Sequence, residues 1–285
     1  MNNSLEAQLE QVEAAIRQAL QEDIGDGDVT TDCIVPADLE LRGQFIAKQA
    51  GVVAGLKVAA RTFAFVDEHV RFTPHVDDGQ KVIPGQIIAE VEGTGRALLS
   101  GERTALNFLQ RMSGIATLTR QFVDAVQGTS TAILDTRKTV PGLRALDKWA
   151  VQLGGGQNHR FGLFDMVLIK ENHITAAGSI TEAVNRVRVK DDRRRPVEVE
   201  VKDLTELEEV LALHVDRVLL DNMSLDTMRQ AVELTDGRVP LEASGNMSLE
   251  RVAAVAAVGV DYVSIGMLTH SVQALDISLL LETKN

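Results

Sequence analysis

Hydrophobic and polar positions follow two different patterns along the chain, with a change near residue 130. Beyond it, short apolar segments alternate with amphipathic segments in which hydrophobic residues recur every three or four positions. The first pattern is typical of buried strands and the second of helices that pack on one side. The predicted strands cover residues 131–135, 165–170, 196–201, 216–221, 239–244 and 261–266. Alternating strands and helices form a parallel sheet, so this half is predicted to be an incomplete α/β barrel.

A dinucleotide-binding fold is the other common arrangement of alternating strands and helices. It requires a GxGxxG motif after its first strand, and none follows residues 131–135. The barrel is therefore preferred.

The first part of the chain has a mixed pattern. A helix is predicted over residues 4–22, with Ser4 as its cap. One face of it carries Leu5, Leu9, Val12, Ile16 and Leu20. Residues 22–32 contain glycines that end helices and are predicted to be a loop rather than an acidic metal site. Residues 39–95 are predicted to be strands, and residues 98–126 a long helix that leads into the second half.

Residues 78–93, DGQKVIPGQIIAEVEG, resemble the hairpin of a lipoyl or biotinyl carrier domain. A carrier needs an exposed lysine for modification, and Lys81 is the nearby candidate. Strand pairing within a structural sandwich is the preferred interpretation. A non-enzymatic carrier or binding module is kept as an alternative.

Charge and composition exclude several classes of partner. Lys and Arg number 29 against 41 Asp and Glu, so the net charge is −12, which disfavours nucleic acid and anionic membranes. Aromatic residues make up 4% and leave little surface for base stacking. The single cysteine, Cys33, excludes an intrachain disulfide and a cysteine-cluster metal site. With no membrane-length apolar run and no signal-peptide pattern, we expect a cytoplasmic protein without nucleic-acid or membrane partners.

Every predicted strand of the second half ends in a charged or small polar residue. The residues are Asp135, Lys170, Glu200, Asp221, Glu242 with Ser244, and Ser264 with Gly266. The carboxyl ends of parallel barrel strands meet at one mouth, where barrel enzymes carry their active sites. The sequence therefore predicts one shared active-site mouth.

The predicted mouth carries several basic residues. Arg137 and Lys138 follow the first strand, and His159 and Arg160 follow a glycine triplet at 154–156. Arginine and lysine side chains match carboxylates and phosphates, so an anionic substrate is expected. The glycines would allow the backbone to approach a ligand closely.

Other features of the mouth suit a phosphorylated substrate. Glu200 and Asp221 would ligate Mg²⁺ or contact sugar hydroxyls, because Mg²⁺ takes oxygen ligands. The segments 244–246 and 264–266 would offer backbone N–H groups to a phosphate, as the last two loops of many barrels do. Of Glu198 and Glu200, one is expected to face the barrel interior and the other the helix layer.

A second chemistry is open for the same mouth. Lys170 follows an apolar strand, and a lysine in an apolar pocket can form a Schiff base with a carbonyl substrate. A Schiff-base lyase or aldolase is therefore an alternative.

Long motifs in a consistent order place the chain close to a known family. They cover residues 22–32, 101–117, 135–144, 154–173, 197–201, 219–223, 241–247 and 261–279. On these motifs the chain resembles quinolinate phosphoribosyltransferase, also called nicotinate-nucleotide pyrophosphorylase (carboxylating), over nearly its whole length. The resemblance implies an N-terminal α/β sandwich domain, residues 1–112 joined by the tail 270–285, and an incomplete α/β barrel, residues 113–269.

The resemblance also implies roles for the matching residues. Quinolinate carboxylates would be held by Arg103 of a neighbouring subunit and by Thr136, Arg137, Lys138, His159 and Arg160. The 5′-phosphate would lie against Ser244, Gly245, Asn246, Ser264, Ile265 and Gly266. Lys170 would face a substrate carboxylate or the pyrophosphate, whereas Glu200 and Asp221 would serve the ribose hydroxyls and Mg²⁺. These last three residues form the predicted catalytic group.

The reaction implied by the resemblance is part of NAD biosynthesis. Quinolinate and phosphoribosyl pyrophosphate would give nicotinate mononucleotide, CO₂ and pyrophosphate, with Mg²⁺ as cofactor. The partners would be the two substrates and further copies of the chain, in a dimer or hexamer with shared active sites. A relative that acts on another pyridine is a remaining alternative.

Overall fold

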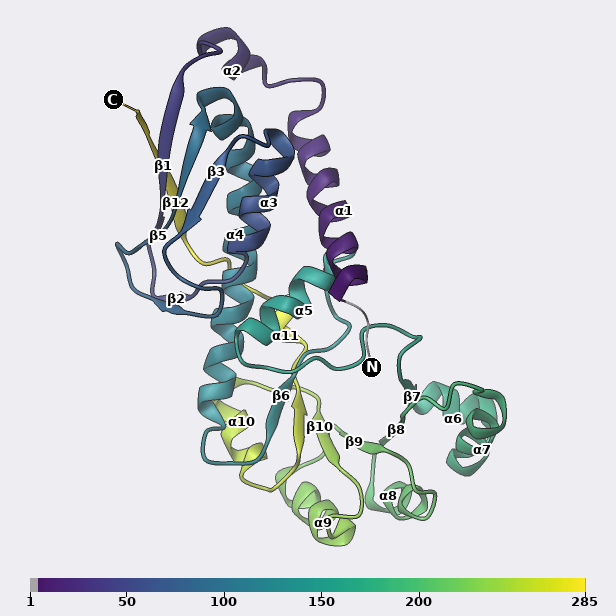
Figure 1. Cartoon of the computed structure of the whole chain (residues 1–285). Coiled ribbons are helices and arrows are strands. Elements are labelled where there is room, and N and C mark those ends of the chain that lie inside the picture. The colour runs from purple at the N-terminus through teal and green to yellow at the C-terminus, as the bar shows by residue number, and fades with distance from the viewer. Residues whose placement is uncertain (1–4, 285) are drawn as a thin grey trace. The chain divides into compact units, whose positions relative to one another are not determined.

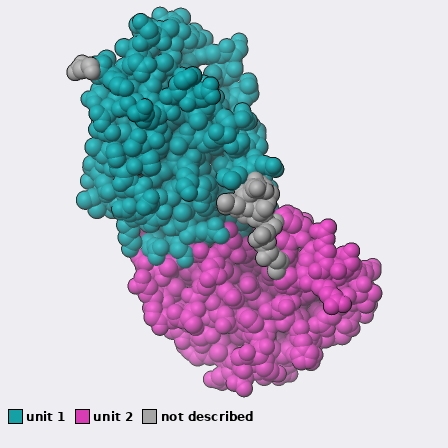
Figure 2. All heavy atoms as spheres, viewed as in Figure 1, with its two compact units in different colours: residues 1–120, 139–155, 268–285 teal, residues 121–138, 156–267 magenta. Residues whose placement is uncertain are grey.

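The computed structural model describes residues 5–284, and the side chains of residues 9–284. The predicted cap Ser4 and the side chain of Leu5 lie outside this range. The chain forms two compact units, shown in different colours in Figure 2. The first unit contains residues 1–120, 139–155 and 268–285, and the second contains residues 121–138 and 156–267.

The first unit begins with two helices, α1 (Leu5–Ile24) and α2 (Val29–Ile34). Val12, Ile16 and Leu20 of α1 are buried as predicted, whereas Leu9 is 47% exposed. The short helix α2 was not predicted, because its region carries the glycines and acidic residues of a loop. It begins at Asp28, whose carboxylate accepts a hydrogen bond from the Thr31 N–H at 3.0 Å.

A four-stranded antiparallel sheet forms the centre of the first unit, in the order β12-β1-β5-β3 (Figure 1). Its strands are β1 (Glu40–Ala47), β3 (Arg71–Pro74), β5 (Ile87–Thr94) and β12 (Ile277–Thr283). Alternate residues of β1 are buried, as expected for a sheet with one face in the core. The C-terminal strand β12 pairs with β1, so the tail returns to the first unit, as the resemblance implies.

The buried face of this sheet is covered by α3 (Leu56–Val66) and the long helix α4 (Gly95–Ala125). Phe45 of β1, Phe63 of α3 and Leu109 of α4 are fully buried in one hydrophobic core. The helix α4 confirms the prediction for residues 98–126. The helix α3 was missed because its small and apolar residues were interpreted as part of a strand-rich region. One sheet covered by helices makes the unit an α/β sandwich.

The segment that resembles a carrier hairpin does not form one. The short strand β4 (Lys81–Val82) pairs with β2 (Gly51–Val52), whereas β5 pairs with β1 and β3. The two halves of the supposed hairpin therefore belong to different sheets. This result argues against the carrier interpretation.

The helix α5 (Arg144–Leu153) joins the first unit, although it lies in the part of the chain assigned from the sequence to the barrel domain, residues 113–269. Arg111 of α4 forms two hydrogen bonds with the fully buried Asp147 of α5, at 2.9 and 2.8 Å. Such a bidentate pair fixes the two helices together. The hydrophobic pattern alone carries no information about this long-range pair.

Gly154 and Gly155 lie at the end of α5. A Cβ on Gly154 would lie 2.6 Å from the Ala116 carbonyl oxygen, and one on Gly155 would lie 2.6 Å from the Arg120 guanidinium. These glycines therefore allow α5 to end against α4. The structure thus gives Gly154 and Gly155 a packing role that the sequence did not predict.

The C-terminal tail crosses α4 at Gly114, where a Cβ would lie 2.2 Å from the backbone oxygen of Gln273. We predict that Gly114→Ala lowers the free energy of unfolding by about 2–3 kcal/mol, because the backbone of the tail must move away. Urea unfolding followed by circular dichroism measures this loss. Asn107→Ala, an exposed change on the same helix, is the control and should change stability little. Equal midpoints for the two variants would contradict the prediction.

The second unit is a parallel sheet with strand order β6-β11-β10-β9-β8-β7. All six predicted strands are present: β6 (Ala132–Leu134), β7 (Val167–Ile169), β8 (Val197–Val201), β9 (Arg217–Asp221), β10 (Leu241–Ser244) and β11 (Tyr262–Ser264). Within the described chain β6 and β7 do not pair. The barrel is therefore incomplete, as predicted.

Helices follow the strands of the second unit. They are α6 (Glu171–Ala177), α7 (Ile180–Lys190), α8 (Leu204–Leu211), α9 (Leu225–Thr235) and α10 (Leu249–Ala256), with the short α11 (Met267–His270) after β11. The side chains of Ser179, Asp203 and Ser224 cap three of them and so fix where the preceding loops end. In the described part of the chain, no helix is both long and apolar enough to cross a membrane.

Candidate active site

The carboxyl ends of the barrel strands carry nearly all of the predicted site residues. Because β6 to β11 are parallel, these ends lie along one edge of the sheet. Ser244 pairs in register with Asp221, and Ser264 pairs with Leu134, directly before Asp135. His159 and Arg160 lie instead in the loop before β7, where Gln157 forms an isolated parallel bridge with Leu134. Arg103 is an exposed residue of α4 in the first unit.

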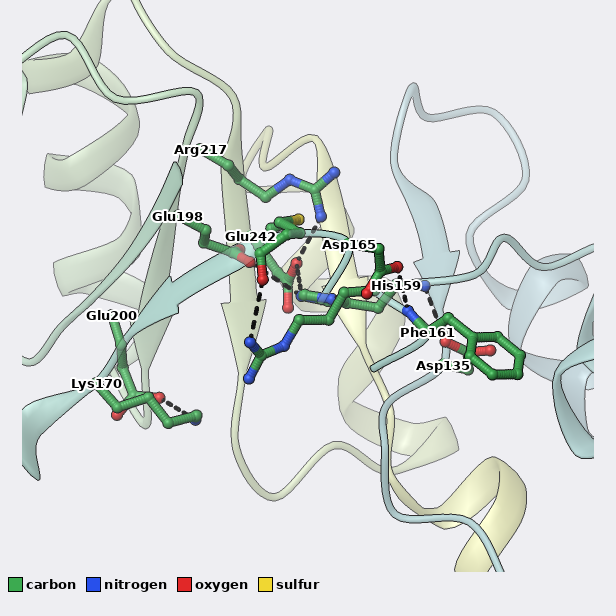
Figure 3. Close-up of polar contacts among 11 residues, drawn as sticks. Asp135, His159, Phe161, Asp165, Lys170, Glu198, Glu200, Arg217 and Glu242 are labelled. Atoms are coloured by element: carbon green, nitrogen blue, oxygen red, sulfur yellow. Dashed lines mark hydrogen bonds and ion pairs between the residues drawn. The ribbon is translucent and has the colours of Figure 1, made fainter. Parts of the chain in front are cut away.

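Lys170 and Glu200 form an ion pair at this edge, with 2.6 Å between Nζ and Oε2 (Figure 3). The Lys170 side chain is 45% exposed. A Schiff-base lysine must be neutral, which requires an apolar pocket. The paired and half-exposed Lys170 is not in such a pocket, so this geometry argues against the lyase alternative.

Glu200 and Asp221 face the same side of the sheet. Glu200 pairs in register with Leu219, and Asp221 lies two residues after Leu219 on the same strand. Residues two apart on a strand share a face. The same rule corrects the expectation for Glu198, which lies two residues before Glu200 and shares its face. The side chain of Asp221 accepts a hydrogen bond from Asn222 Nδ2 at 2.9 Å.

A buried cluster lies below this edge, around His159 (Figure 3). Its Nε2 lies 3.0 Å from Glu198 Oε2 and 3.3 Å from Glu242 Oε2. Both glutamates are fully buried. Arg217 pairs with Glu242 at 3.1 Å and stacks on the Tyr262 ring. Two buried carboxylates thus contact the imidazole, and Arg217 pairs with one of them.

The loop that carries His159 is held by hydrogen bonds from its backbone N–H groups to side chains. The His159 N–H donates to Asp135 Oδ1 at 2.8 Å, and the Arg160 N–H donates to His159 Nδ1 at 2.6 Å. The N–H groups of Phe161 and Gly162 both donate to the carboxylate of Asp165. Both ring nitrogens of His159 therefore have partners within the protein, which favours a positioning role over the predicted contact with a substrate carboxylate.

The charges of the cluster compensate one another. Burial lowers the pKa of His159, but the hydrogen bonds and charges of Glu198 and Glu242 outweigh it and raise the pKa to about 9. Burial raises the pKa of Glu198, and the charge of Glu242 adds to this effect. Burial alone would raise the pKa of Glu242, but His159, Ser264 and Arg217 lower it overall. These effects favour the neutral form of Glu198 and the ionised form of Glu242 beside Arg217.

Two arginines of the site lie close enough to repel each other. Burial, and then the positive charge of Arg137, lower the pKa of the Arg160 guanidinium. Arg137 and Lys138 are exposed, and Arg160 is partly buried with one hydrogen bond to the Met166 carbonyl oxygen at 3.2 Å. Thr136 Oγ1 accepts the Lys138 N–H at 3.1 Å and so shapes the loop. Adjacent guanidinium groups are favourable only when an anion lies between them, so this pair suits a carboxylate or phosphate ligand.

The two segments predicted to bind the phosphate, 244–246 and 264–266, differ in backbone conformation and in exposure. Gly245 has a φ of +98°, and a Cβ there would lie 2.0 Å from Asn222 Oδ1, so only glycine fits. Asn246 follows with a φ of +45° and an exposed side chain. Ser264 is buried, and it lowers the pKa of Glu242. The Ile265 N–H donates to the Leu134 carbonyl oxygen at 2.9 Å, so this segment is tied to β6.

Sequence reasoning missed Glu198, Glu242 and Arg217 as parts of the site. Glu242 was noted only as a charged residue near a strand end, and Glu198 only as an alternative to Glu200. The available signal was an acidic residue inside an otherwise apolar strand, VEVEV and LEAS, because a buried carboxylate requires a partner.

Comparisons with known proteins agree with this architecture. Residues 28–113 match the family model "Quinolinate phosphoribosyl transferase, N-terminal domain", and residues 115–280 match the corresponding C-terminal domain. The chain belongs to the quinolinate phosphoribosyltransferase family. Both family domains are present, and together they include every predicted site residue.

Individual relatives of this family are similar over nearly the whole chain. Quinolinate phosphoribosyltransferase [decarboxylating] 1b of Nicotiana tabacum is 45% identical over 96% of this chain and 83% of its own length. A probable nicotinate-nucleotide pyrophosphorylase [carboxylating] of Bacillus subtilis is 43% identical over 94% and 93%. The crystal structure of NadC from Streptococcus pyogenes has a TM-score of 0.93 and 41% identity, covering 96% of this chain and 98% of that one. The family's fold is thus shared from end to end.

Proposed function

We propose that this chain is a quinolinate phosphoribosyltransferase that converts quinolinate and phosphoribosyl pyrophosphate to nicotinate mononucleotide, CO₂ and pyrophosphate. The observation that carries the proposal is the pair of neighbouring cations Arg137 and Arg160 at the strand ends of a barrel of this family. Quinolinate has two adjacent carboxylates, and two neighbouring guanidinium groups match that pattern of charge.

The clamp for quinolinate consists of Arg137, Lys138 and Arg160, with Thr136 shaping the loop. These residues come from the two loops that leave β6 and precede β7. Holding both carboxylates fixes the ring nitrogen in one orientation toward the sugar, and orientation of the two reactants lowers the entropic part of the barrier.

Glu200 and Asp221 would contact the ribose of phosphoribosyl pyrophosphate. The ring nitrogen forms a bond to the anomeric carbon while the bond from that carbon to the pyrophosphate oxygen breaks. Positive charge develops on the sugar during this exchange, and nearby carboxylates stabilise it. Lys170 is an ammonium positioned to offset negative charge on the departing pyrophosphate.

A magnesium ion fits this part of the site. Glu200 and Asp221 supply carboxylate oxygens on one face of neighbouring strands, which is the ligand type that Mg²⁺ prefers. When bound with the substrate, Mg²⁺ supplies charge neutralisation to the pyrophosphate.

Loss of CO₂ follows formation of the pyridinium. The bond between the ring and the carboxylate next to the nitrogen breaks, its electron pair stays on the ring carbon, and a proton then replaces the carboxylate. The positively charged ring nitrogen accepts electron density during this step, so no side chain must act as a nucleophile. The 5′-phosphate would rest on Ser244, Gly245 and Asn246 and on the backbone of 264–266.

The proposed enzyme is a homo-oligomer, a dimer or hexamer, in which Arg103 of one subunit completes the site of another. The exposed position of Arg103 on α4 is compatible with this role. A cytoplasmic location belongs to the same proposal.

A direct assay tests the function. The protein is mixed with quinolinate, phosphoribosyl pyrophosphate and Mg²⁺, and pyrophosphate and CO₂ are measured together. We expect equal amounts of both, and loss of turnover when EDTA removes Mg²⁺. Turnover of nicotinate but not quinolinate would contradict the assignment in favour of another pyridine substrate. An adduct on Lys170 trapped by borohydride would instead support the lyase.

A further inference from the structure

His159 connects the two loops of the clamp to the interior of the barrel. Its backbone N–H bonds to Asp135, which directly precedes Thr136 and Arg137, and its Nδ1 accepts the backbone N–H of Arg160. The ring itself bonds only to the Arg160 N–H, whereas the bond to Asp135 is made by the His159 backbone. Contacts that hold the ring therefore support the Arg160 loop directly and the Asp135 loop through the position of the His159 backbone.

The His159 ring is held on its Nε2 side by side chains of two strands. Glu198 of β8 and Glu242 of β10 both reach Nε2, and Arg217 of β9 holds Glu242 (Figure 3). Glu198 and Arg217 pair in register, so they project from neighbouring positions on the same face. This arrangement leaves the ring little freedom to rotate.

We propose that Glu242, Glu198 and Arg217 are positioning residues that act through His159 to hold Arg137 and Arg160 in place for quinolinate. This role rests on the proposed function. None of the three needs to touch a substrate, since their effect passes through the His159 ring to the Arg160 N–H and through the His159 backbone N–H to Asp135.

A contribution to folding stability does not by itself explain why these charged residues lie in the interior of the barrel. Burying ionised side chains costs free energy, and apolar side chains of similar size are often at least as stabilising. A network of buried charges directly below a substrate clamp is instead the arrangement that keeps the clamp in a defined geometry.

A metal site is the main competing interpretation. The ligand atoms of His159, Glu198 and Glu242 lie within 4.8 Å of one another, as in a metal centre. However, the Arg217 guanidinium already pairs with Glu242 Oε2 at 3.1 Å and so competes with a metal ion for this carboxylate.

Glu242→Gln is the variant that tests the proposal, because it removes the charge and keeps the shape. We expect the KM for quinolinate to rise about 10-fold or more, since small displacements of positioning groups are costly, while the KM for phosphoribosyl pyrophosphate stays unchanged. Glu233→Gln, an exposed change on α9, is the matched control. Combining Glu242→Gln with His159→Asn should be no worse than His159→Asn alone, because both act through one ring.

Hydrogen exchange gives a readout without substrate. The amides of Arg160 and Phe161 should exchange faster in the Glu242→Gln variant than in the parent protein, because the loop loses its support. If Glu242→Gln does not fold, Arg217→Lys takes its place in both measurements. This change keeps the positive charge but removes the planar guanidinium group that pairs with Glu242.

Three outcomes would overturn the proposal. They are an equal rise of both KM values, unchanged loop exchange, and a stoichiometric metal ion in the purified protein that Glu242→Gln removes. Absence of quinolinate turnover in the parent protein would contradict the proposed function instead, and the exchange measurement would still decide whether Glu242 holds the loop.

Discussion

Arg137→Ala is expected to abolish measurable binding of quinolinate while the protein remains folded. Arg137 is exposed and forms no part of either core, so its truncation should leave stability unchanged. Removing one member of a charge clamp leaves a substrate carboxylate without its partner, which costs about 2–5 kcal/mol of binding free energy. Arg160→Ala would be less informative, because Arg160 also holds the Met166 carbonyl oxygen.

Calorimetric titration of quinolinate into the purified variant measures this loss, and circular dichroism checks the fold. Arg229→Ala, an exposed arginine on α9, provides the control for the loss of one surface charge and should bind normally. Unchanged affinity of the Arg137→Ala variant would remove Arg137 from the site.

The second large effect is recovery of activity in a mixed oligomer. Arg103→Ala and Lys170→Ala should each be inactive alone, since each removes one cation of the site. If Arg103 serves the neighbouring barrel, a mixed dimer contains one site with both native residues. Co-expression of equal amounts should then restore roughly a quarter of the wild-type activity, because half of the dimers are mixed and each has one intact site.

The matched control mixes Lys170→Ala with Arg137→Ala. Both residues belong to the second unit, so each barrel site of a mixed dimer still lacks one of them. No recovery is expected for this pair. Failure of both mixtures would show that Arg103 acts within its own chain, whereas full activity of Arg103→Ala alone would show that it has no role in the site.

The barrel was predictable because its signal is local. Each strand, for example VEVEV or RVLLD, is a short apolar run between amphipathic segments, and the six strands lie where the pattern places them. The incomplete closure follows from the same pattern only with the help of the family resemblance. The strands of the first unit were harder to predict from the sequence. For example, β2 and β4 have two residues each, and they pair with each other across a long stretch of chain.

The site was predictable only in part. Charged residues at strand ends, such as Lys170 and Asp221, can be recognised from the strand pattern. The cluster around His159 cannot, because it depends on four segments that meet only in the folded barrel. A sequence shows that Glu242 lies in an apolar strand, but not that Arg217 and His159 neutralise it.

The pairing of β12 with β1 has a consequence for synthesis of the protein in the cell. The sheet of the first unit needs residues 277–283, so it stays incomplete until the residues of the barrel, which come before them in the sequence, have been synthesised. Until then β1 has an unpaired edge, which is a site for wrong pairing with other chains. Folding of the first unit is therefore coupled to synthesis of the barrel between its two parts.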